Sequence, residues 1–356
     1  MSRPLVVFGG PSDEHDISIL TGLQVARALG DVDCVYWTKS GEWYLVDPGL
    51  EAADFADGVP RKARELTFEA SPGRGFVLKK KPMAPTAVIN ACHGGPGEDG
   101  TLQGLMDLAG LRYTGPGQAA SALGMDKLAF GAAMAAVGLP TLPRTLVGEG
   151  VTAPFGGPYI VKPRFGGSSI GIEVVEDWDT VVALWRTSPF MKQGAVVEPF
   201  LEGSRDIQIA VRTHPKLELS AIEEPIRPEG GIYSYDQKYL AWGGEVSGGR
   251  QLPAQLEPEL EARIREYARR VASAAGLRGV ARIDFLCQGG EVFVNEVNTI
   301  PGSMAAYLWI DPPLGRRQLF EDMLAEALAT PARVFSTAGS DGTALRSAGA
   351  IASKLG

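Results

Sequence analysis

The chain has 356 residues, 45% of them hydrophobic and 21% charged, and it carries a formal net charge of -8. This length and composition predict a soluble globular protein with two or three domains. The acidic balance argues against a general nucleic-acid-binding protein, and no apolar stretch approaches the roughly 18 residues of a membrane span.

Cysteine usage indicates the compartment. Cys34, Cys92 and Cys287 are odd in number, far apart and without metal-ligand spacing. This pattern predicts a reducing environment, without a disulfide framework or a zinc site. The apolar run near the start, PLVVF, is too short for a signal peptide, so we expect a cytoplasmic protein.

The first part of the chain, up to a boundary near Gly117, predicts an α/β unit. Buried-strand runs alternate with a helix that ends at a glycine and with a glycine-rich turn that leads into a second helix. The expected strands are 4–8, 32–38, 42–46 and 86–94, and the expected helices are 17–30 and one within 97–117 that is followed by a short exit segment.

The second part predicts a helix over 121–140 and then strands around a Gly/Ser-rich loop. From about Asp206 two strands, a loop, a long helix and a hairpin follow, the hairpin being indicated by the turn QGG. The last twenty residues, rich in Ser, Ala and Gly, predict a loosely held tail. The expected strands are 158–163, 172–176, 195–200, 206–213 and 219–225, with the helix at 256–276 and the hairpin at 281–298.

The hairpin carries the most informative polar residues. Glu296 and Asn298 are two apart on one strand, so they share a face, and Asp284 lies near the end of the partner strand. Three oxygen donors from paired strands suit Mg²⁺, with Arg282 beside them. The alternative is a solvated sheet face, on which acidic residues are common.

The loop RFGGSSIG (164–171) follows a strand that ends in Lys162. Its glycines and serines can present backbone N–H groups to phosphate oxygens. The loop is neither a P-loop nor a dinucleotide fingerprint, because no Lys-Ser or Lys-Thr pair follows and a strand comes next. The alternative is an ordinary hairpin turn.

Two turns near expected strand ends also carry chemistry-bearing residues. Glu14 lies at the start of the first helix, where an acid also offsets the helix dipole, and His93 ends a strand at a crevice position. A hydrolase is disfavoured because the GxSxG motif is missing.

Taken together, these stretches resemble the D-alanine–D-alanine ligases of the ATP-grasp superfamily. The matching segments occur in order over almost the whole chain, from Val7 to about Leu328. They are FGGPSDEHDIS, HGGPGEDGTLQGLMDLAGLRYTGPG, SALGMDK, VKPRFGGSSIG, VVEPFLEG, IYSYDQKY, ARIDF and VNEVNTIPGS.

The resemblance implies an ATP-grasp fold, α/β with α+β character in the C-terminal part. It implies a Rossmann-like N-terminal domain (1–117) on the side of the first substrate, a central domain (118–205), a C-terminal domain (206–335) and a tail (336–356), with ATP held between the second and third domains. It also implies amino acids as small-molecule substrates, no nucleic-acid or membrane partner, and a homodimer.

The same resemblance assigns roles to residues. Two Mg²⁺ ions, or Mn²⁺, would bind at Asp284, Glu296 and Asn298. Arg282 and the N–H of Gly302 would stabilise an oxyanion, and Ser168, Tyr239 and Glu14 would form a hydrogen-bond network. Glu14 and His93 would contact the first amino acid. ATP would be held by Lys127, Lys162, Glu198, Pro199, Phe200, Leu201, Asp206 and Lys238.

The implied reaction transfers the γ-phosphoryl group of ATP to a carboxylate, and the amine of a second amino acid then attacks the acyl phosphate. Tyr239 favours an amine over a hydroxyl acceptor. In GSMAAYLW, Tyr307 stands where the family has a serine that holds the second substrate, and Ser303 is a possible substitute. The expected function is D-alanine–D-alanine ligation for peptidoglycan. The alternatives are ligation of a different amino acid pair in natural-product biosynthesis, and a nucleotide-binding protein without catalysis.

Overall fold

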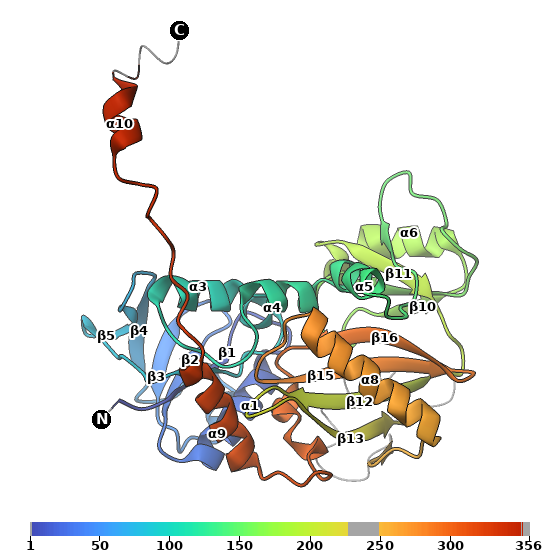
Figure 1. Ribbon diagram of the computed structural model, residues 1–356, viewed down its shortest axis with the longest axis horizontal. Helices are drawn as coiled ribbons and strands as arrows, with labels where there is room; N and C mark the ends of the chain where they lie inside the picture. The colour runs from blue at the N-terminus through green and yellow to red at the C-terminus, as the bar shows by residue number, and fades with distance from the viewer. Residues whose placement is uncertain (1, 227–248, 350, 352–356) are drawn as a thin grey trace.

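The structure is a computed structural model that describes residues 2–226, 249–349 and 351 (Figure 1). Lys238 and Tyr239, two residues with expected roles, lie outside the described part. Within that part three sheets, of seven, four and five strands, follow one another along the chain. The first sheet and the third lie on opposite sides of the molecule in Figure 1, and the second lies above the third.

The first sheet has the strand order β6-β5-β4-β3-β2-β1-β7. β1 pairs in parallel with β2 and β7, whereas the neighbours from β2 to β6 are antiparallel. β1 is buried throughout because helices cover both faces of the sheet. The strands are β1 (Leu5–Gly9), β2 (Asp33–Trp37), β3 (Trp43–Val46), β4 (Arg64–Glu69), β5 (Gly75–Leu78), β6 (Lys81–Pro82) and β7 (Val88–Asn90).

Helices from both ends of the chain cover this sheet. α1 (His15–Leu29) and α9 (Arg316–Ala329) share one apolar cluster with β1 and β2, and α3 (Thr101–Ala109) packs on the other face. α1 ends at Gly30, which has a φ of 82°, as the glycine stop predicted. Short helical turns complete this part: η1 (Ala52–Phe55) and α2 (Gly95–Glu98).

The second sheet is antiparallel, with the order β10-β9-β11-β8. Its apolar face packs against α6 (Trp178–Thr187) and the turn η2 (Pro189–Met191). The sequence analysis predicted neither β8 nor α6. The strands are β8 (Thr145–Val147), β9 (Tyr159–Pro163), β10 (Glu173–Val175) and β11 (Ala195–Pro199).

The third sheet is also antiparallel, with the order β14-β13-β12-β15-β16. One face packs against α8 (Pro258–Ala274) and α5 (Lys127–Ala136), and the other face carries the polar residues described below. The β15–β16 hairpin turns at Gly289 and Gly290, both with positive φ, which confirms the QGG turn. The strands are β12 (Arg205–Arg212), β13 (Glu218–Pro225), β14 (Arg250–Gln251), β15 (Val280–Gln288) and β16 (Glu291–Asn298).

The single helix predicted over 121–140 is wrong, because the chain breaks at Asp126. α4 (Gln118–Met125) ends there and α5 (Lys127–Ala136) begins. The Asp126 carboxylate caps α5 by accepting from the N–H groups of Leu128 and Ala129, at 3.1 and 3.2 Å. The break places Lys127 in the first turn of the second helix.

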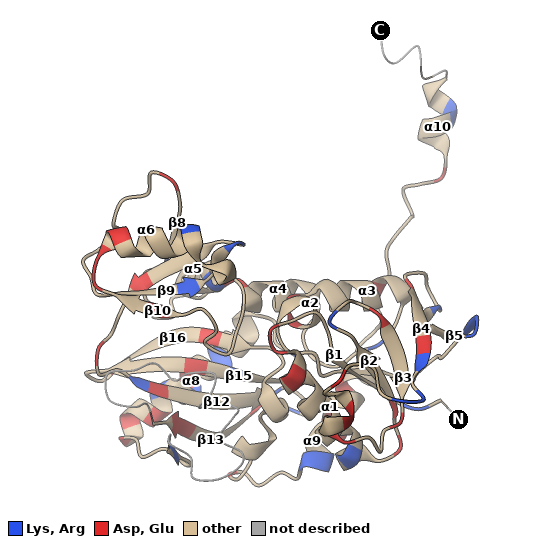
Figure 2. Cartoon of the chain, turned by 180° about the vertical axis from the view of Figure 1, so that it is seen from behind, with Lys and Arg blue, Asp and Glu red and all other residues tan. Residues whose placement is uncertain are grey.

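The C-terminal segment beyond α9 contains one helix, α10 (Thr343–Ala348), that the sequence did not predict. No side chain of α10 is buried, and Figures 1 and 2 show this helix well apart from the rest of the described chain. Within the described residues, no helix is both long and apolar enough to cross a membrane.

Candidate active site

The polar face of the third sheet brings the predicted metal-binding residues together. Asp284 on β15 lies directly opposite Glu296 on β16, and Arg282 lies opposite Asn298. Residues opposite each other in an antiparallel pair point to the same side. The apolar side chains that alternate with them face α8. The pleat of one hairpin therefore gathers two carboxylates, an amide and a guanidinium on one surface.

Asp284 is the centre of this group. Arg282 donates from Nε and one terminal nitrogen to its two oxygens, at 2.7 and 2.8 Å. The amides of Asn298 and Gln208 approach Oδ2 at 3.3 and 3.4 Å. In the described part of the chain, no group of three or more His, Cys, Asp and Glu side chains could hold a metal. Two carboxylates and one amide oxygen nevertheless fit a hard cation that keeps water or phosphate oxygens as its other ligands.

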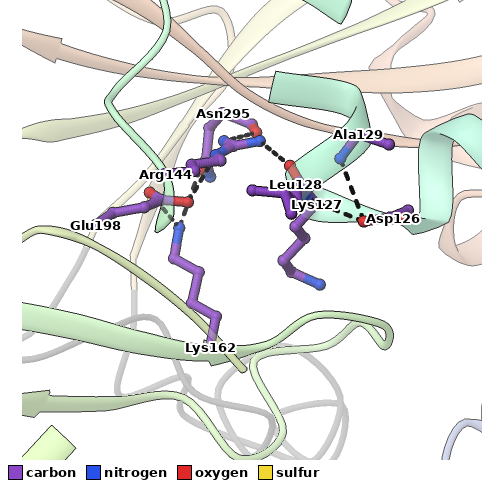
Figure 3. Close-up of polar contacts among 8 residues, drawn as sticks. All are labelled: Asp126, Lys127, Leu128, Ala129, Arg144, Lys162, Glu198 and Asn295. Atoms are coloured by element: carbon purple, nitrogen blue, oxygen red, sulfur yellow. Dashed lines mark hydrogen bonds and ion pairs between the residues drawn. The ribbon is translucent and has the colours of Figure 1, made fainter. Parts of the chain in front are cut away.

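A buried ion cluster holds the lysine at the end of β9 (Figure 3). Lys162 Nζ donates to Glu198 Oε2 at 2.9 Å and to Asn295 Oδ1 at 3.2 Å. Arg144 Nε lies 2.8 Å from Glu198 Oε1. Burial acts to raise the pKa of Glu198, but the two cations outweigh it and hold this pKa below the ordinary value. Glu198 is thus a charged buried anchor for Lys162.

Lys127 enters the same region from α5. Its Nζ donates to the carbonyl of Gly166 at 2.5 Å, which ties the helix to the predicted phosphate loop. Burial lowers the pKa of Lys127, and the nearby cations Lys162 and Arg144 act in the same direction, whereas Glu296 opposes them. Figure 3 shows that Lys127 and Lys162 come from different elements. Glu296 on the acidic face of the third sheet lines one pocket with Lys162 and another with Lys127.

A pocket lies between the second and third sheets beside this volume. Its wall combines apolar side chains, suited to a flat ring, with charged and amide groups. Every predicted ATP-contacting residue within the described part lines it except Lys127 and Glu198. The lining residues are Leu142, Ile160, Lys162, Ser169, Ile172, Pro199, Phe200, Leu201, Ser204, Asp206, Gln208, Asp284, Leu286, Asn295 and Glu296.

A second, smaller pocket joins the first domain to this centre. Ser168 donates to the carboxylate of Glu14, and both residues are buried. This is the contact that the predicted network required of these two residues, which are 154 positions apart. A Cβ on Gly94 or Gly167 would lie 2.4 or 3.0 Å from Glu14 Oε2, and Gly94 also has a φ of 62°, so the backbone of both glycines passes close to this carboxylate. Lys127, Glu98, Glu296 and Asn298 line the same pocket.

Comparison with known proteins agrees with this architecture. Residues 3–116 match the family model described as D-ala D-ala ligase N-terminus, and residues 141–324 match D-ala D-ala ligase C-terminus. The chain belongs to the D-alanine–D-alanine ligase family. It is therefore an ATP-dependent ligase with an ATP-grasp fold, and ligases of this family work with ATP and a divalent metal ion.

Individual relatives match along nearly their whole length. A D-alanine--D-alanine ligase from Mycobacterium sp. (strain KMS) is 35% identical, covering 92% of this chain and 96% of the relative. The solved VanG D-Ala:D-Ser ligase from Enterococcus faecalis superposes with a TM-score of 0.77 at 25% identity, over 92% of this chain and all of the other. The D-alanine–D-alanine ligase from Helicobacter pylori gives 0.72 at 25% identity, over 93% and 99%.

His93, a predicted substrate residue of this family member, is fully engaged by its neighbours. Nδ1 lies 2.6 Å from the carbonyl of Ile300, so it carries the proton, and Nε2 accepts from Thr21 Oγ1 at 2.7 Å. Thr21 in turn accepts from the N–H of Ser303 at 3.1 Å. Burial lowers the pKa of His93 to about 4. The neutral ring thus ties the first domain to the turn after β16.

That turn, η4 (Gly302–Leu308), has an unusual backbone. Ser303, Met304 and Ala305 all have φ near +50°, a left-handed conformation that costs free energy in residues with a Cβ. Met304 N–H donates to Pro301 O at 2.8 Å, and Met304 and Ala305 are buried. Packing therefore maintains the strained turn that follows the predicted oxyanion donor Gly302.

Tyr307 also has a defined partner. Its hydroxyl donates to Glu223 Oε2 at 3.0 Å, and Arg250 lies over its ring at 5.3 Å. The Ser303 N–H is held by Thr21, as described above. The predicted substrate residues of this turn are thus anchored by contacts to β13 and α1.

Sequence reasoning missed two charged residues of the site. Arg144 pairs with Glu198, and its side chain also donates to the carbonyl groups of Lys127 and Asn295. Glu98 accepts from the N–H groups of Gly94 and Ile300, both at 2.9 Å. Burial, with the charge of Glu14, raises the pKa of Glu98 to about 7. Glu98 lies in the glycine-rich motif HGGPGEDG, and this position could have indicated its role from the sequence.

Proposed function

We propose that the protein is a D-alanine–D-alanine ligase that joins two D-alanine molecules at the expense of ATP for peptidoglycan synthesis. The observation that carries the proposal is that Lys162, Asp284 and Glu296 line one pocket between two sheets, together with apolar side chains. A ligase that activates a carboxylate needs such a site to hold a nucleotide by its base and its phosphates. The 35% identical relative bears the name of this activity.

We assign different roles to the apolar side chains of the pocket and to the nearby lysines. Its apolar wall supports placement of adenine, whereas Lys127 and Lys162 lie where phosphate charge would need cations. Glu198 acts through Lys162, because its oxygens already contact two cations. The proposed nucleotide residues are Lys127, Lys162, Glu198, Pro199, Phe200, Leu201, Asp206 and, outside the described residues, Lys238.

We propose that two Mg²⁺ ions bind at Asp284, Glu296 and Asn298, with Mn²⁺ as the alternative ion. When bound, such ions would neutralise phosphate charge during transfer to the carboxylate. The support is the placement of the three oxygen donors on one face of the hairpin.

The first amino acid would lie near Glu14, whose buried carboxylate suits an ammonium group. Ser168 orients that carboxylate, and Tyr239, outside the described residues, would complete the network. Arg282 and the N–H of Gly302 would donate to the oxyanion formed when the second amine attacks. His93 supports this arrangement by fixing the turn that carries Gly302.

We further propose a homodimer that works in the cytoplasm, and a division of the chain near residues 117, 205 and 335. Three buried cysteines outside any disulfide are compatible with a reducing compartment. The three successive sheets support the domain division.

A phosphate-release screen tests the function. Purified protein is mixed with ATP, Mg²⁺ and individual D- and L-amino acids or their pairs, and the products are identified by mass spectrometry. D-Alanine alone should stimulate phosphate release and yield the dipeptide. If only another amino acid or a mixed pair does so, the protein is a ligase of different specificity.

A further inference from the structure

A buried carboxylate outside the assigned site, Glu223, continues the row of polar residues on the third sheet. Glu223 on β13 lies opposite Gln208 on β12, Gln208 lies opposite Asp284, and Asp284 lies opposite Glu296. All four side chains therefore project from the same face. With neighbouring strands about 4.8 Å apart, Glu223 is roughly 10 Å from Asp284 along the row. This row places Glu223 beside the reaction centre, two strands from the metal-binding hairpin.

The protein supplies few donors to this carboxylate. Glu223 is 4% exposed, Oε2 accepts from Tyr307, and Oε1 lies 3.4 Å from a terminal nitrogen of Arg250. The Arg250 side chain is 56% exposed, so water screens its charge. A buried carboxylate is costly unless further donors reach it. The ammonium group of an amino acid would supply them.

The surroundings of Glu223 point to the second substrate rather than the first. η4, which begins at Gly302 and carries Tyr307, contacts β12, β13 and β15. Arg282 and Asp284 both act electrostatically on Glu223, and burial raises its pKa. Glu14, the acid proposed for the first amino acid, belongs to a different pocket, with Gly167 and Lys127. The pocket of Glu14 does not include Glu223, so the two acids have different surroundings.

We propose that Glu223 binds the ammonium group of the second, accepting amino acid, and that Tyr307 holds the Glu223 carboxylate in position. The inference rests on the proposed ligase function, because it needs an amine acceptor. It assigns to Tyr307 a positioning role through Glu223 in place of direct contact with the substrate. The ammonium would give one proton to the Glu223 carboxylate, and the neutral amine would then attack the carbonyl carbon of the acyl phosphate, whose oxygen faces Arg282. The new C–N bond forms as the C–O bond to phosphate breaks and inorganic phosphate leaves.

Steady-state kinetics of Glu223→Gln test the proposal. The rate of ADP release is measured against D-alanine concentration, and the two successive binding events are fitted with separate KM values. We expect the second KM to rise at least tenfold and the first KM to stay within twofold. Tyr307→Phe, which keeps the charge and removes its fixed donor, should raise the second KM by a smaller factor.

Glu224→Gln is the matched control. Glu224 is the next residue of the same strand but pairs with Arg205 at 2.6 Å, so its loss should leave both KM values unchanged. If the contact between Tyr307 and Glu223 is purely structural, Glu223→Gln and Tyr307→Phe should both lower the melting temperature but should not change the second KM more than the first. That result would overturn the proposal. If Glu223→Gln does not fold, Tyr307→Phe decides between the same outcomes.

The wild-type assay separates this inference from the proposed function. If a different pair of amino acids stimulates ATP turnover, the proposed specificity for D-alanine is wrong. The KM of Glu223→Gln is then measured for the second amino acid of that pair. Should no amino acid stimulate ATP turnover, both proposals fail.

Discussion

The Nζ atom of Lys162 lies 2.9 Å from Oε2 of Glu198, and both side chains are buried. A buried ammonium without a partner is costly, so the contact with the Glu198 carboxylate stabilises Lys162 in these surroundings. The ion pair with Glu198 keeps the Lys162 ammonium in place in the wall of the pocket. Because Arg144 contacts the other oxygen of Glu198, the cluster retains an excess of positive charge, which suits a polyphosphate.

Replacement of Glu198 by Gln should destabilise the protein by about 3 to 5 kcal/mol. The change leaves Lys162 and Arg144 buried without a carboxylate, and an uncompensated buried charge has a cost of this order. The free energy of unfolding is measured in urea. Glu149→Gln is the control, because Glu149 pairs with Arg186 at the surface, with side-chain exposures of 84% and 58%. It should change stability by less than about 1 kcal/mol, and an equal loss in both variants would contradict the role of burial.

Substitution of Glu296 by Gln should reduce ATP turnover by about 100-fold or more, since loss of a metal-binding carboxylate removes several kcal/mol of charge stabilisation. The measurement is amino-acid-dependent ADP release over a range of Mg²⁺ concentrations. Glu291→Gln, at the exposed start of the same strand, should behave like wild type. Wild-type turnover in Glu296→Gln with an unchanged melting temperature would remove Glu296 from the metal site.

His93 should make stability depend on pH. Its folded-state pKa is about 4, against 6.5 for an unhindered histidine. Between these values the unfolded chain binds a proton that the folded chain does not, so stability falls as the pH is lowered. From pH 7.5 to 4.5 this contribution is about 2 to 3 kcal/mol. Urea unfolding at the two pH values should show that the free energy of unfolding falls less in His93→Gln than in wild type, by this amount. An equal fall in both proteins would contradict the assignment.

Much of the site could be predicted because its residues sit in local motifs. The alternation of Glu296 and Asn298 and the turn QGG place an acid and an amide on one face of a hairpin whatever surrounds it. The Gly/Ser-rich loop between two strands was also expected, and it lies between β9 and β10, although the positive φ values of Ser168 and Ser169, 55° and 59°, were not predicted. These features depend on neighbours within a few residues.

Other features depended on distant partners. Local periodicity continued through Asp126, and the break appears only with the cap on α5 and the ion pair between Asp126 and Arg164. Arg144 lies outside any recognised motif. Its role in the site follows from its ion pair with Glu198, which lies 54 positions further along the chain. The pairing of Tyr307 with Glu223 joins residues 84 positions apart.

The sequence by itself determined the class of fold, the family and the hairpin that carries the acidic residues. Backbone periodicity, turn chemistry and motifs depend on residues that are close together in the chain. The tertiary structure alone decided which charges neutralise one another and which remain available to a substrate. That distinction depends on burial, since the same carboxylate is screened at the surface and strongly coupled to its neighbours inside the protein.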